Sequence, residues 1–403
     1  MRTFIAGSAL TVAVTALACA TDEDPSLQPT DHPSPLPGAD ASPSDGDGGE
    51  IADAGAADPC LPESLCPNGP FEPSAVGGPL DLRTRIRVIR GRSANDVWAV
   101  GARGAAAHFD GTSWSRAQTG AVESLSALWL LDAGEIAMAT PPIGYAHGAD
   151  LIPADGATPS PTGWIRAKEP VLPAAIVQGT IRPITSLFAP ADAEWAWGTI
   201  VEGTSSTSPS QKNGLWRARV LEGDGGRNVE FAVVLPPGAC AALGCVQMQD
   251  IHGSNADDLW AVGVKGATFH ITGAQSETPT VRALNSRTWA GLNGVWAASP
   301  TDVWAVGGAG TIRHYTGGEV AWDVVEDVPT TEDLHAVWGT SKTDVWAVGD
   351  HATVLHYDGV TWSLVDVRGL GDRLPDLCTV WTSAPGHVWV GGDGVILSLG
   401  GKP

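Results

Sequence analysis

Residues 343–362 read TDVWAVGDHATVLHYDGVTW and hold two tryptophans, two histidines and two aspartates that adjoin glycines. Such a density of polar and aromatic side chains occurs in active sites, and also in structural units that a chain repeats. The opening of the stretch recurs as NDVWAVG at 95–101, DDLWAVG at 257–263, TDVWAVG at 301–307 and GHVWVGG at 386–392, with weaker copies GEIAMA at 134–139 and EWAWG at 194–198. The stretch is therefore a building unit.

The seven copies share one anchor position, which is tryptophan in six of them. The anchors are Trp98, Ile136, Trp195, Trp260, Trp304, Trp346 and Trp389. Their basic period is near 42 residues, and insertions lengthen the second and third copies. A period of about 40–45 residues is typical of a β-propeller, in which each repeat forms one blade.

The copy at 334–366 also shows four short strands. Its apolar runs are LHAVWGT, VWAVG, TVLHY and TWSLVDV, and turn residues separate them. Both faces of VWAVG are apolar or small, as expected for a strand sandwiched between two neighbouring blades. The sequence thus predicts an all-β fold, a seven-bladed β-propeller of four-stranded antiparallel blades over residues 76–403.

The seventh blade is expected to take one strand from elsewhere in the chain. The last copy, 377–398, supplies only three strands. An unpaired edge strand pairs readily with other chains, so a closed ring needs a partner for it. We expect Gly78–Thr84, which precedes the first full copy, to be that fourth strand.

The repeat has the form S/T-x-x-DVWAVG-x-x-G-x-(I/V)-x-HYDG-x-x-W. This pattern resembles the tandem repeats of secreted bacterial propeller lipoproteins, which are related in fold to kelch, galactose-oxidase and BNR-type propellers. The resemblance covers about residues 80–403 and implies a lipid-anchored propeller without a defined activity. The segment DGVTW at 358–362 is also similar to the sialidase Asp-box, S-x-D-x-G-x-T-W, with one residue fewer between Asp and Gly. That box is a structural hairpin and implies no catalysis.

The N-terminus has the form of a secretory signal. Arg2 is followed by an uncharged run over 4–18, which is too short to span a membrane as a helix. The sequence ALAC at 16–19 is similar to a degenerate lipobox, which predicts a signal peptide at 1–18 and lipid attachment to Cys19. Ordinary cleavage is the alternative, because 16–18 and 18–20 both fit an A-x-A site. The residue after Cys19 is Ala20 and not the Asp that favours retention in the inner membrane in some bacteria, so we expect the protein at the outer membrane.

Residues 19–75 are expected to form a disordered linker. They are rich in Asp, Pro, Gly, Ser and Ala, and they lack the hydrophobic periodicity that would offset the entropy lost on ordering. From Thr21 to Leu82 there are 13 acidic residues and no Lys or Arg. The segment SDGDGGE at 44–50 departs from a calcium loop, because Gly49 stands at a ligand position and Glu50 where the loop needs glycine.

The cysteines agree with export. In an oxidising compartment the close pairs Cys60 with Cys66 and Cys240 with Cys245 are each expected to form a disulfide. Metal binding is the alternative, but neither spacing is C-x₂-C and no zinc-type histidine spacing accompanies them. Cys378 occupies an apolar repeat position and is expected to be a buried free thiol. No metal and no cofactor are predicted.

The repeated polar residues are predicted to be structural. Four histidines lie ten residues after their anchors: His108, His270, His314 and His356. Because one histidine per blade cannot converge on a metal ion, we expect structural hydrogen bonds from them. Four aspartates stand two residues before their anchors: Asp96, Asp258, Asp302 and Asp344. Together with Asp110 and Asp358 they are expected to fix turns. His351 has no counterpart and sits in a turn.

Ligand-binding residues are expected where the copies differ from one another. Eight residues before the anchors stand Arg90, Leu128, Leu187, His252, Trp296, Trp338 and Trp381, at a position predicted to lie on the innermost strand. Arg90 and His252 are the polar exceptions there and are candidate ligand contacts. Trp164 and Trp216 lie in the insertions at 140–180 and 199–247, either as partner contacts or as core residues of outer strands.

The net charge and the absence of catalytic motifs exclude several classes of function. The net charge of −22 argues against nucleic acid and anionic lipid as partners. The chain has no nucleophile elbow, phosphate loop, dinucleotide fingerprint or H-E-x-x-H motif. We therefore predict a monomeric, non-enzymatic propeller that binds a protein or a glycan at the cell envelope, or a scaffold there, with its lipid as the membrane anchor. The alternative is a glycan-active enzyme, a glycoside hydrolase or lyase, since its paired carboxylates can come from distant blades.

Overall fold

The computed structural model describes residues 59–401, apart from 72, 74, 174–182, 192, 201–214, 224, 235–242 and 244–246. The signal peptide at 1–18, the lipidation site Cys19, the linker up to residue 58 and the Cys240/Cys245 pair lie outside the described residues. No helix in the described part of the chain is long and apolar enough to cross a membrane.

The described strands form seven antiparallel sheets of four strands each, as predicted. Blade 1 holds β2 (Ile86–Ser93), β3 (Asp96–Gly101), β4 (Ala105–Phe109) and β5 (Trp114–Gln118). Blade 2 holds β6 (Ala127–Leu131), β7 (Gly134–Thr140), β8 (Ile143–His147) and β9 (Ile165–Arg166). Blade 3 holds β10 (Ile184–Phe188), β11 (Ala196–Ile200), β12 (Leu215–Gly223) and β13 (Gly226–Val233).

The remaining sheets repeat this plan. Blade 4 holds β14 (Met248–Gly253), β15 (Asp258–Gly263), β16 (Ala267–Thr272) and β17 (Thr280–Asn285). Blade 5 holds β18 (Leu292–Ser299), β19 (Asp302–Gly307), β20 (Thr311–Tyr315) and β21 (Asp323–Val324). Blade 6 holds β22 (Leu334–Ser341), β23 (Asp344–Gly349), β24 (Val354–Tyr357) and β25 (Trp362–Leu364). Blade 7 holds β26 (Leu377–Thr382), β27 (Val388–Gly392), β28 (Val395–Leu399) and β1 (Leu65–Pro67).

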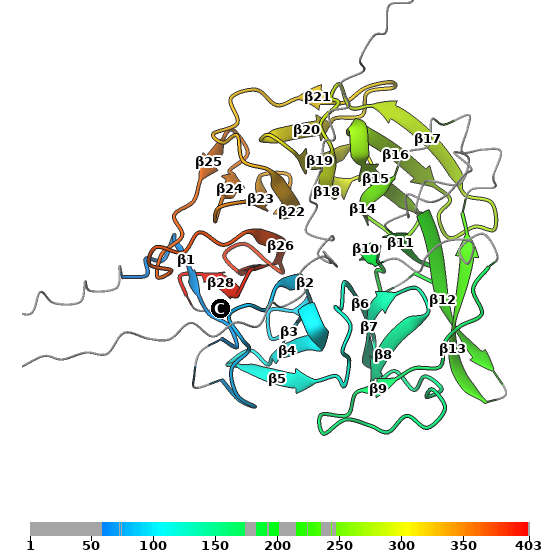
Figure 1. Cartoon of the computed structure of the whole chain (residues 1–403). Coiled ribbons are helices and arrows are strands. Elements are labelled where there is room, and N and C mark those ends of the chain that lie inside the picture. The colour runs from blue at the N-terminus through cyan, green and yellow to red at the C-terminus, as the bar shows by residue number, and fades with distance from the viewer. Residues whose placement is uncertain are drawn as a thin grey trace, which may run out of the picture.

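The blades stand around a central axis, and the first strand of each blade lies innermost (Figure 1). Each first strand contacts the first strands of the two neighbouring blades, and β2 contacts β26 to complete the circle. We call the end with the turns between first and second strands the hairpin face. The opposite end is the linker face, where the chain passes to the next blade and where the 3₁₀ turns η1 (Ala102–Gly104) and η3 (Val264–Gly266) lie.

Tryptophan packing between blades explains the anchor. In β15, β19 and β23 every residue after the first is buried, so both faces of these strands lie inside the protein. The ring of Trp260 lies 4.4 Å from Tyr315 and 5.2 Å from Trp322, both in the next blade. Trp389 of blade 7 packs in the same way against Phe109 of blade 1, at 4.9 Å. These contacts fill the space between radially arranged sheets.

The ring is closed by an N-terminal strand, but by a different one from the segment predicted. β1 pairs antiparallel with β28, and Cys66 lies opposite Ser398. The prediction that Gly78–Thr84 forms this strand is wrong, and β1 falls within 19–75, the range assigned to the linker. The Cys60–Cys66 disulfide is present at the start of this closing segment. Gly78–Thr84 contains instead a turn in which Thr84 donates to the carbonyl of Asp81.

The register of blade 3 moves one predicted anchor. Trp197 pairs with Phe188 of the first strand, as Trp260 pairs with His252 in blade 4. The anchor of the third copy is therefore Trp197 and not Trp195. Trp195 is buried just before β11, beneath the guanidinium groups of Arg217 and Arg219 at 4.3 and 4.4 Å.

Candidate binding site

The four repeated histidines form the same structural unit in blades 1, 4, 5 and 6. The Nε2 atoms of His108, His314 and His356 lie 2.9, 2.9 and 2.8 Å from Asp96, Asp302 and Asp344, and His270 lies 3.0 Å from Asp258. Each imidazole also stacks on the anchor tryptophan of its own blade, at 3.8–4.4 Å between ring centres. The prediction of structural hydrogen bonds from these histidines is confirmed.

The aspartates divide into two roles. The four that precede the anchors bind the histidine across the strand pair, rather than fixing a turn as predicted. Asp110 and Asp358 do fix hairpin turns: each Oδ1 accepts from the N–H groups two and three residues further on, at 2.8 and 2.9 Å. His351 stands in an exposed turn, where its Nδ1 lies 2.9 Å from Glu332. None of these groups converges on a shared site.

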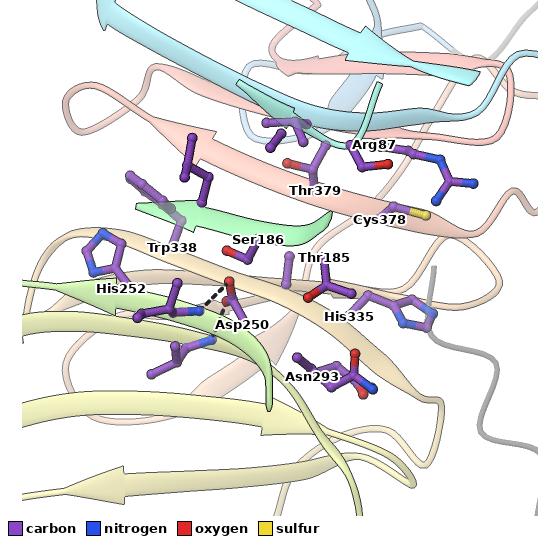
Figure 2. A pocket seen from close by; sticks show the side chains of 18 of the residues that line it. Arg87, Thr185, Ser186, Asp250, His252, Asn293, His335, Trp338, Cys378 and Thr379 are labelled. Atoms are coloured by element: carbon purple, nitrogen blue, oxygen red, sulfur yellow. Dashed lines mark hydrogen bonds between the residues drawn. The ribbon is translucent and has the colours of Figure 1, made fainter. Parts of the chain in front are cut away.

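The central channel contains a narrow polar cavity of about 80 Å³, which holds about two or three water molecules. All seven first strands line it, and Figure 2 shows Ser186, Asp250 and Asn293 in its middle part. Cys378 also lines the cavity; it is disulfide-bonded, so the prediction of a free thiol is wrong. The cavity is too small for a sugar or a peptide, and its contents are limited to water or a small ion.

Asp250 is a half-buried carboxylate that lines this channel. Its oxygens accept hydrogen bonds from the backbone N–H groups of Val295, at 2.8 Å, and Ile251, at 2.9 Å (Figure 2). Burial raises the pKa of Asp250, because the charged form loses water, and the Ser186 hydroxyl, the Val295 N–H and the Arg90 charge oppose that rise. Asp250 is thus part of the fixed polar wall that Arg90 also joins.

Arg90 and His252 are brought together by Trp338. The guanidinium of Arg90 lies over the Trp338 ring at 4.4 Å, and His252 meets the same ring edge-on at 4.8 Å. His252 Nδ1 accepts from the N–H of Ala297 at 3.2 Å, so this nitrogen carries no proton. Burial and then the Arg90 charge lower the pKa of His252 to about 3. Burial lowers the pKa of Arg90 to about 10, against the effect of Asp250, so Arg90 is charged and His252 neutral near pH 7.

These residues belong to a ring of side chains at the end of the channel near the hairpin face. The residues that pair with the anchors are Arg90, Trp129, Phe188, His252, Trp296, Trp338 and Trp381, and we call this set the mouth ring. Leu128 and Leu187, the predicted members, each lie one residue away. The turn between first and second strands differs in length in blades 2 and 3, and this shifts the count by one.

An open groove adjoins the mouth ring on the hairpin face. It has a volume of about 440 Å³ and is lined by 252–254, 296–299, 302 and 338–342. We call it the mouth groove. Ser254, Ser299, Thr340 and Ser341 supply hydroxyls, and Lys342 supplies a positive charge. Asp302 is its one lining carboxylate, and His314 binds that carboxylate. The groove is therefore polar at its rim, aromatic at its inner end, and without a free acidic side chain.

Trp164 and Trp216 do not take part in this site. Trp164 is 0% exposed and lies edge-on to Trp98, at 5.5 Å. Trp216 is 1% exposed and packs on Phe231 at 4.9 Å. Neither ring can reach a ligand, so of the two interpretations of these residues the structure supports the core one. Tryptophans of the same kind, such as Trp114 and Trp362, are the sequence signal for it.

Comparisons with known proteins match the fold. No family model and no curated protein matches the sequence. YCF48 from Cyanidioschyzon merolae is similar in structure, with a TM-score of 0.55 and 16% identity over 80% of this chain and 97% of that one. A structure described as YCF48 bound to D1 peptide has a TM-score of 0.54 and 14% identity over 86% and 98%. At these identities the likeness supports the seven-bladed propeller fold alone.

Proposed function

We propose that this protein is a non-enzymatic binding module that captures an extended polypeptide segment at the mouth groove. The observation that carries the proposal is the juxtaposition of the mouth ring with an open groove of about 440 Å³. Tryptophan and arginine dominate the binding energy of protein interfaces, particularly where they stand at the centre of a patch surrounded by polar groups. Trp338 lines the mouth groove among hydroxyl groups, and Arg90 stacks on the ring of Trp338 from the channel side.

A polypeptide fits this groove better than a glycan. Sugars bind tryptophan by stacking on a free ring face. Arg90 covers a face of the Trp338 ring, and Trp296 is only 5% exposed. The groove instead offers hydroxyls for backbone hydrogen bonds and Lys342 for an acidic side chain. The structural neighbour bound to D1 peptide is a propeller that holds a peptide, which supports the same class of ligand.

The enzyme alternative lacks support at this site. A glycoside hydrolase needs two carboxyl groups about 5–10 Å apart on either side of the bond that is cleaved. Among the described residues, Asp250 is the one acidic residue that lines the channel cavity and Asp302 the one that lines the mouth groove. Backbone N–H groups hold the first and His314 the second.

Affinity capture with groove variants tests the proposal. Ser254→Arg fills the groove and Lys342→Glu reverses its charge; both positions lie outside the mouth ring. Lys265→Glu on the linker face is the matched control, with the same change of charge far from the groove. We expect the same captured protein to be lost by both groove variants and retained by the control. A partner that all three variants retain would exclude the mouth groove as its binding site. Selective binding on a glycan array would mean that the ligand is a sugar and not a polypeptide.

We also propose that lipid on Cys19 anchors the propeller to the bacterial envelope, on the outer membrane. The support is the ALAC sequence after an uncharged run, together with the Cys60–Cys66 disulfide, which is typical of an exported protein. Labelled palmitate should enter the wild-type chain and not the Cys19→Ala variant. Equal labelling, or secretion of both chains into the medium, would rule out the anchor.

A further inference from the structure

Blade 1 has the opposite charge to the rest of the chain. Residues 83–116 contain seven arginines and two aspartates. Outside this stretch the chain has 43 acidic residues and 16 Lys or Arg. Such a reversal creates a local positive field on an acidic protein, and fields of this kind select and orient charged partners.

Two of these arginines have no structural use within the described residues. Arg85 binds Asp393 through its Nη2 at 2.8 Å, and Arg92 binds both Asp96 and Glu135. By contrast, the side chains of Arg103 and Arg116 make no ion pair or hydrogen bond in the part of the chain that the structure describes. Unpaired guanidinium groups on an acidic protein are available to an external anion.

The fold does not require arginine at position 103. This residue stands in the left-handed region, with φ 52°, in the turn η1 between the second and third strands of blade 1. The corresponding turn carries Lys265 in blade 4, with φ 57°, and Ala309 in blade 5, with φ 53°. Because alanine serves the same turn, the positive charge of Arg103 is not needed for folding.

A large groove lies between the segment that precedes β2 and the end of the outer strand β5 of blade 1. It has a volume of about 940 Å³ and is lined by 79–81, 83–84, 102–105 and 116–121, and we call it the arginine groove. Leu80 and Ala117 are buried at its walls, while Arg83, Arg103 and Arg116 carry its positive charges. Asp81 is its one lining carboxylate and is bound by Arg83 at 2.7 Å. The groove has the size and charge to hold several residues of an acidic polypeptide.

We propose that the arginine groove binds the acidic N-terminal segment of this same chain, residues 21–58. That segment has ten acidic residues and no Lys or Arg. It joins the described chain at Pro59, beside blade 7, which is the neighbour of blade 1. A chain of 38 residues can span up to about 130 Å when fully extended, so the groove lies within its reach.

Covalent attachment favours this occupant over an acidic partner protein. The surface outside blade 1 is acidic and repels an acidic molecule that approaches from solution. A tethered segment avoids that barrier, because its effective concentration near the groove is in the millimolar range for short linkers. The contact is separate from the mouth groove, and it would hold the tether against blade 1.

Zero-length crosslinking in the full mature chain tests the proposal. Arg103→Lys keeps the charge and adds an amine, which a carbodiimide joins to a carboxylate in direct contact. We expect crosslinked peptides between position 103 and residues 21–58. Mixing isotopically heavy and light protein separates crosslinks within one chain from those between chains, and the proposal requires the former. The native amine of Lys265, in the corresponding turn of blade 4, is the internal comparison.

A second substitution distinguishes binding of residues 21–58 in the arginine groove from their mere nearness to position 103. Adding Arg116→Gln should lower the crosslink yield at position 103 about two- to fivefold, the effect of one exposed charge pair. Salt at about 1 M, where the Debye length is about 3 Å, should abolish the crosslink. A yield indifferent to Arg116→Gln and to salt overturns the proposal. Crosslinks that are only intermolecular, or none to 21–58 while the amine still reacts with an acylating agent, also overturn it.

Discussion

Asp344 lies 2.8 Å from the Nε2 of His356, and the same imidazole stacks on Trp346 at 4.2 Å. The hydrogen bond from His356 is the main reason why the pKa of Asp344 lies below its usual value, with further hydrogen bonds from Thr340 and Trp346. This carboxylate therefore fixes an imidazole that fixes an indole, and the indole packs between blades 6 and 7. The same contacts hold the anchors of blades 1, 4 and 5 in one orientation.

The first prediction is that this unit makes blade 6 sensitive to acid. A carboxylate with a lowered pKa stabilises the fold above its unfolded value of 3.8, and the contribution is lost as pH falls through the lower, folded value. Asp344→Asn should lower the free energy of unfolding by about 1 kcal/mol at pH 7. The deficit should shrink below pH 3.8, which urea unfolding at both pH values measures. Asp327→Asn, on an exposed loop, is the control, and an equal deficit there would refute the role of Asp344.

Much of this fold is predictable from the sequence, because each blade repeats the same packing problem. The position of Trp346 between two sheets, the histidine at a fixed distance and the hairpin at Asp358 all follow from local pattern. The strand β1 does not, since LCP at 65–67 is too short to show alternation and joins the ring through a partner over 300 residues away. Closure is a tertiary event that periodicity cannot reveal.

The candidate site was predictable only in part, for a related reason. Arg90 and His252 stand out because they break a repeated position, and both line the channel. Counting residues from an anchor fails where a turn changes length, which is why Trp129 and Phe188 replace the predicted leucines. The mouth groove and the arginine groove are both formed where loops that are distant in sequence meet in the fold. The spacing of residues in the sequence does not show which loops meet.

The second prediction concerns interblade packing. Trp346→Ala should lower the free energy of unfolding by roughly 3–5 kcal/mol, because a large cavity opens between blades 6 and 7. Trp289→Ala provides the comparison, since Trp289 is 85% exposed and its loss should change stability by less than about 0.5 kcal/mol. Chemical denaturation of the two variants under one set of conditions separates them. Similar values would mean that the anchor is not a packing residue.

The third prediction concerns the closing segment. The Cys60–Cys66 disulfide restrains the residues that lead into β1, with a sequence separation of 6. In the chain-entropy view a loop of this size contributes about 2 kcal/mol. Replacing both cysteines with alanine should lower the melting temperature, and deleting 59–67 should lower it further, because β28 loses its partner strand. The comparison variant lacks residues 70, 71 and 73, which follow β1, and keeps the pairing of β1 with β28. If this variant lost more in melting temperature than the variant without 59–67, the assignment of β1 would be wrong.

The fourth prediction concerns His252, whose pKa of about 3 follows from burial and from the nearby Arg90 charge. In the unfolded chain its pKa is near 6.5, so between these values the unfolded chain binds a proton that the folded chain does not. The folded state therefore loses stability as pH falls below 6.5, by about 1.4 kcal/mol per pH unit from this residue. His252→Gln should reduce that slope in unfolding measured from pH 6.5 to 4.5. The imidazole resonances of His252 should remain those of the neutral ring over this range, while those of exposed His351, whose pKa Glu332 raises, should titrate above 6.5. A His252 resonance that titrates near 6.5 would show that water reaches this end of the channel and that the mouth ring does not bury His252.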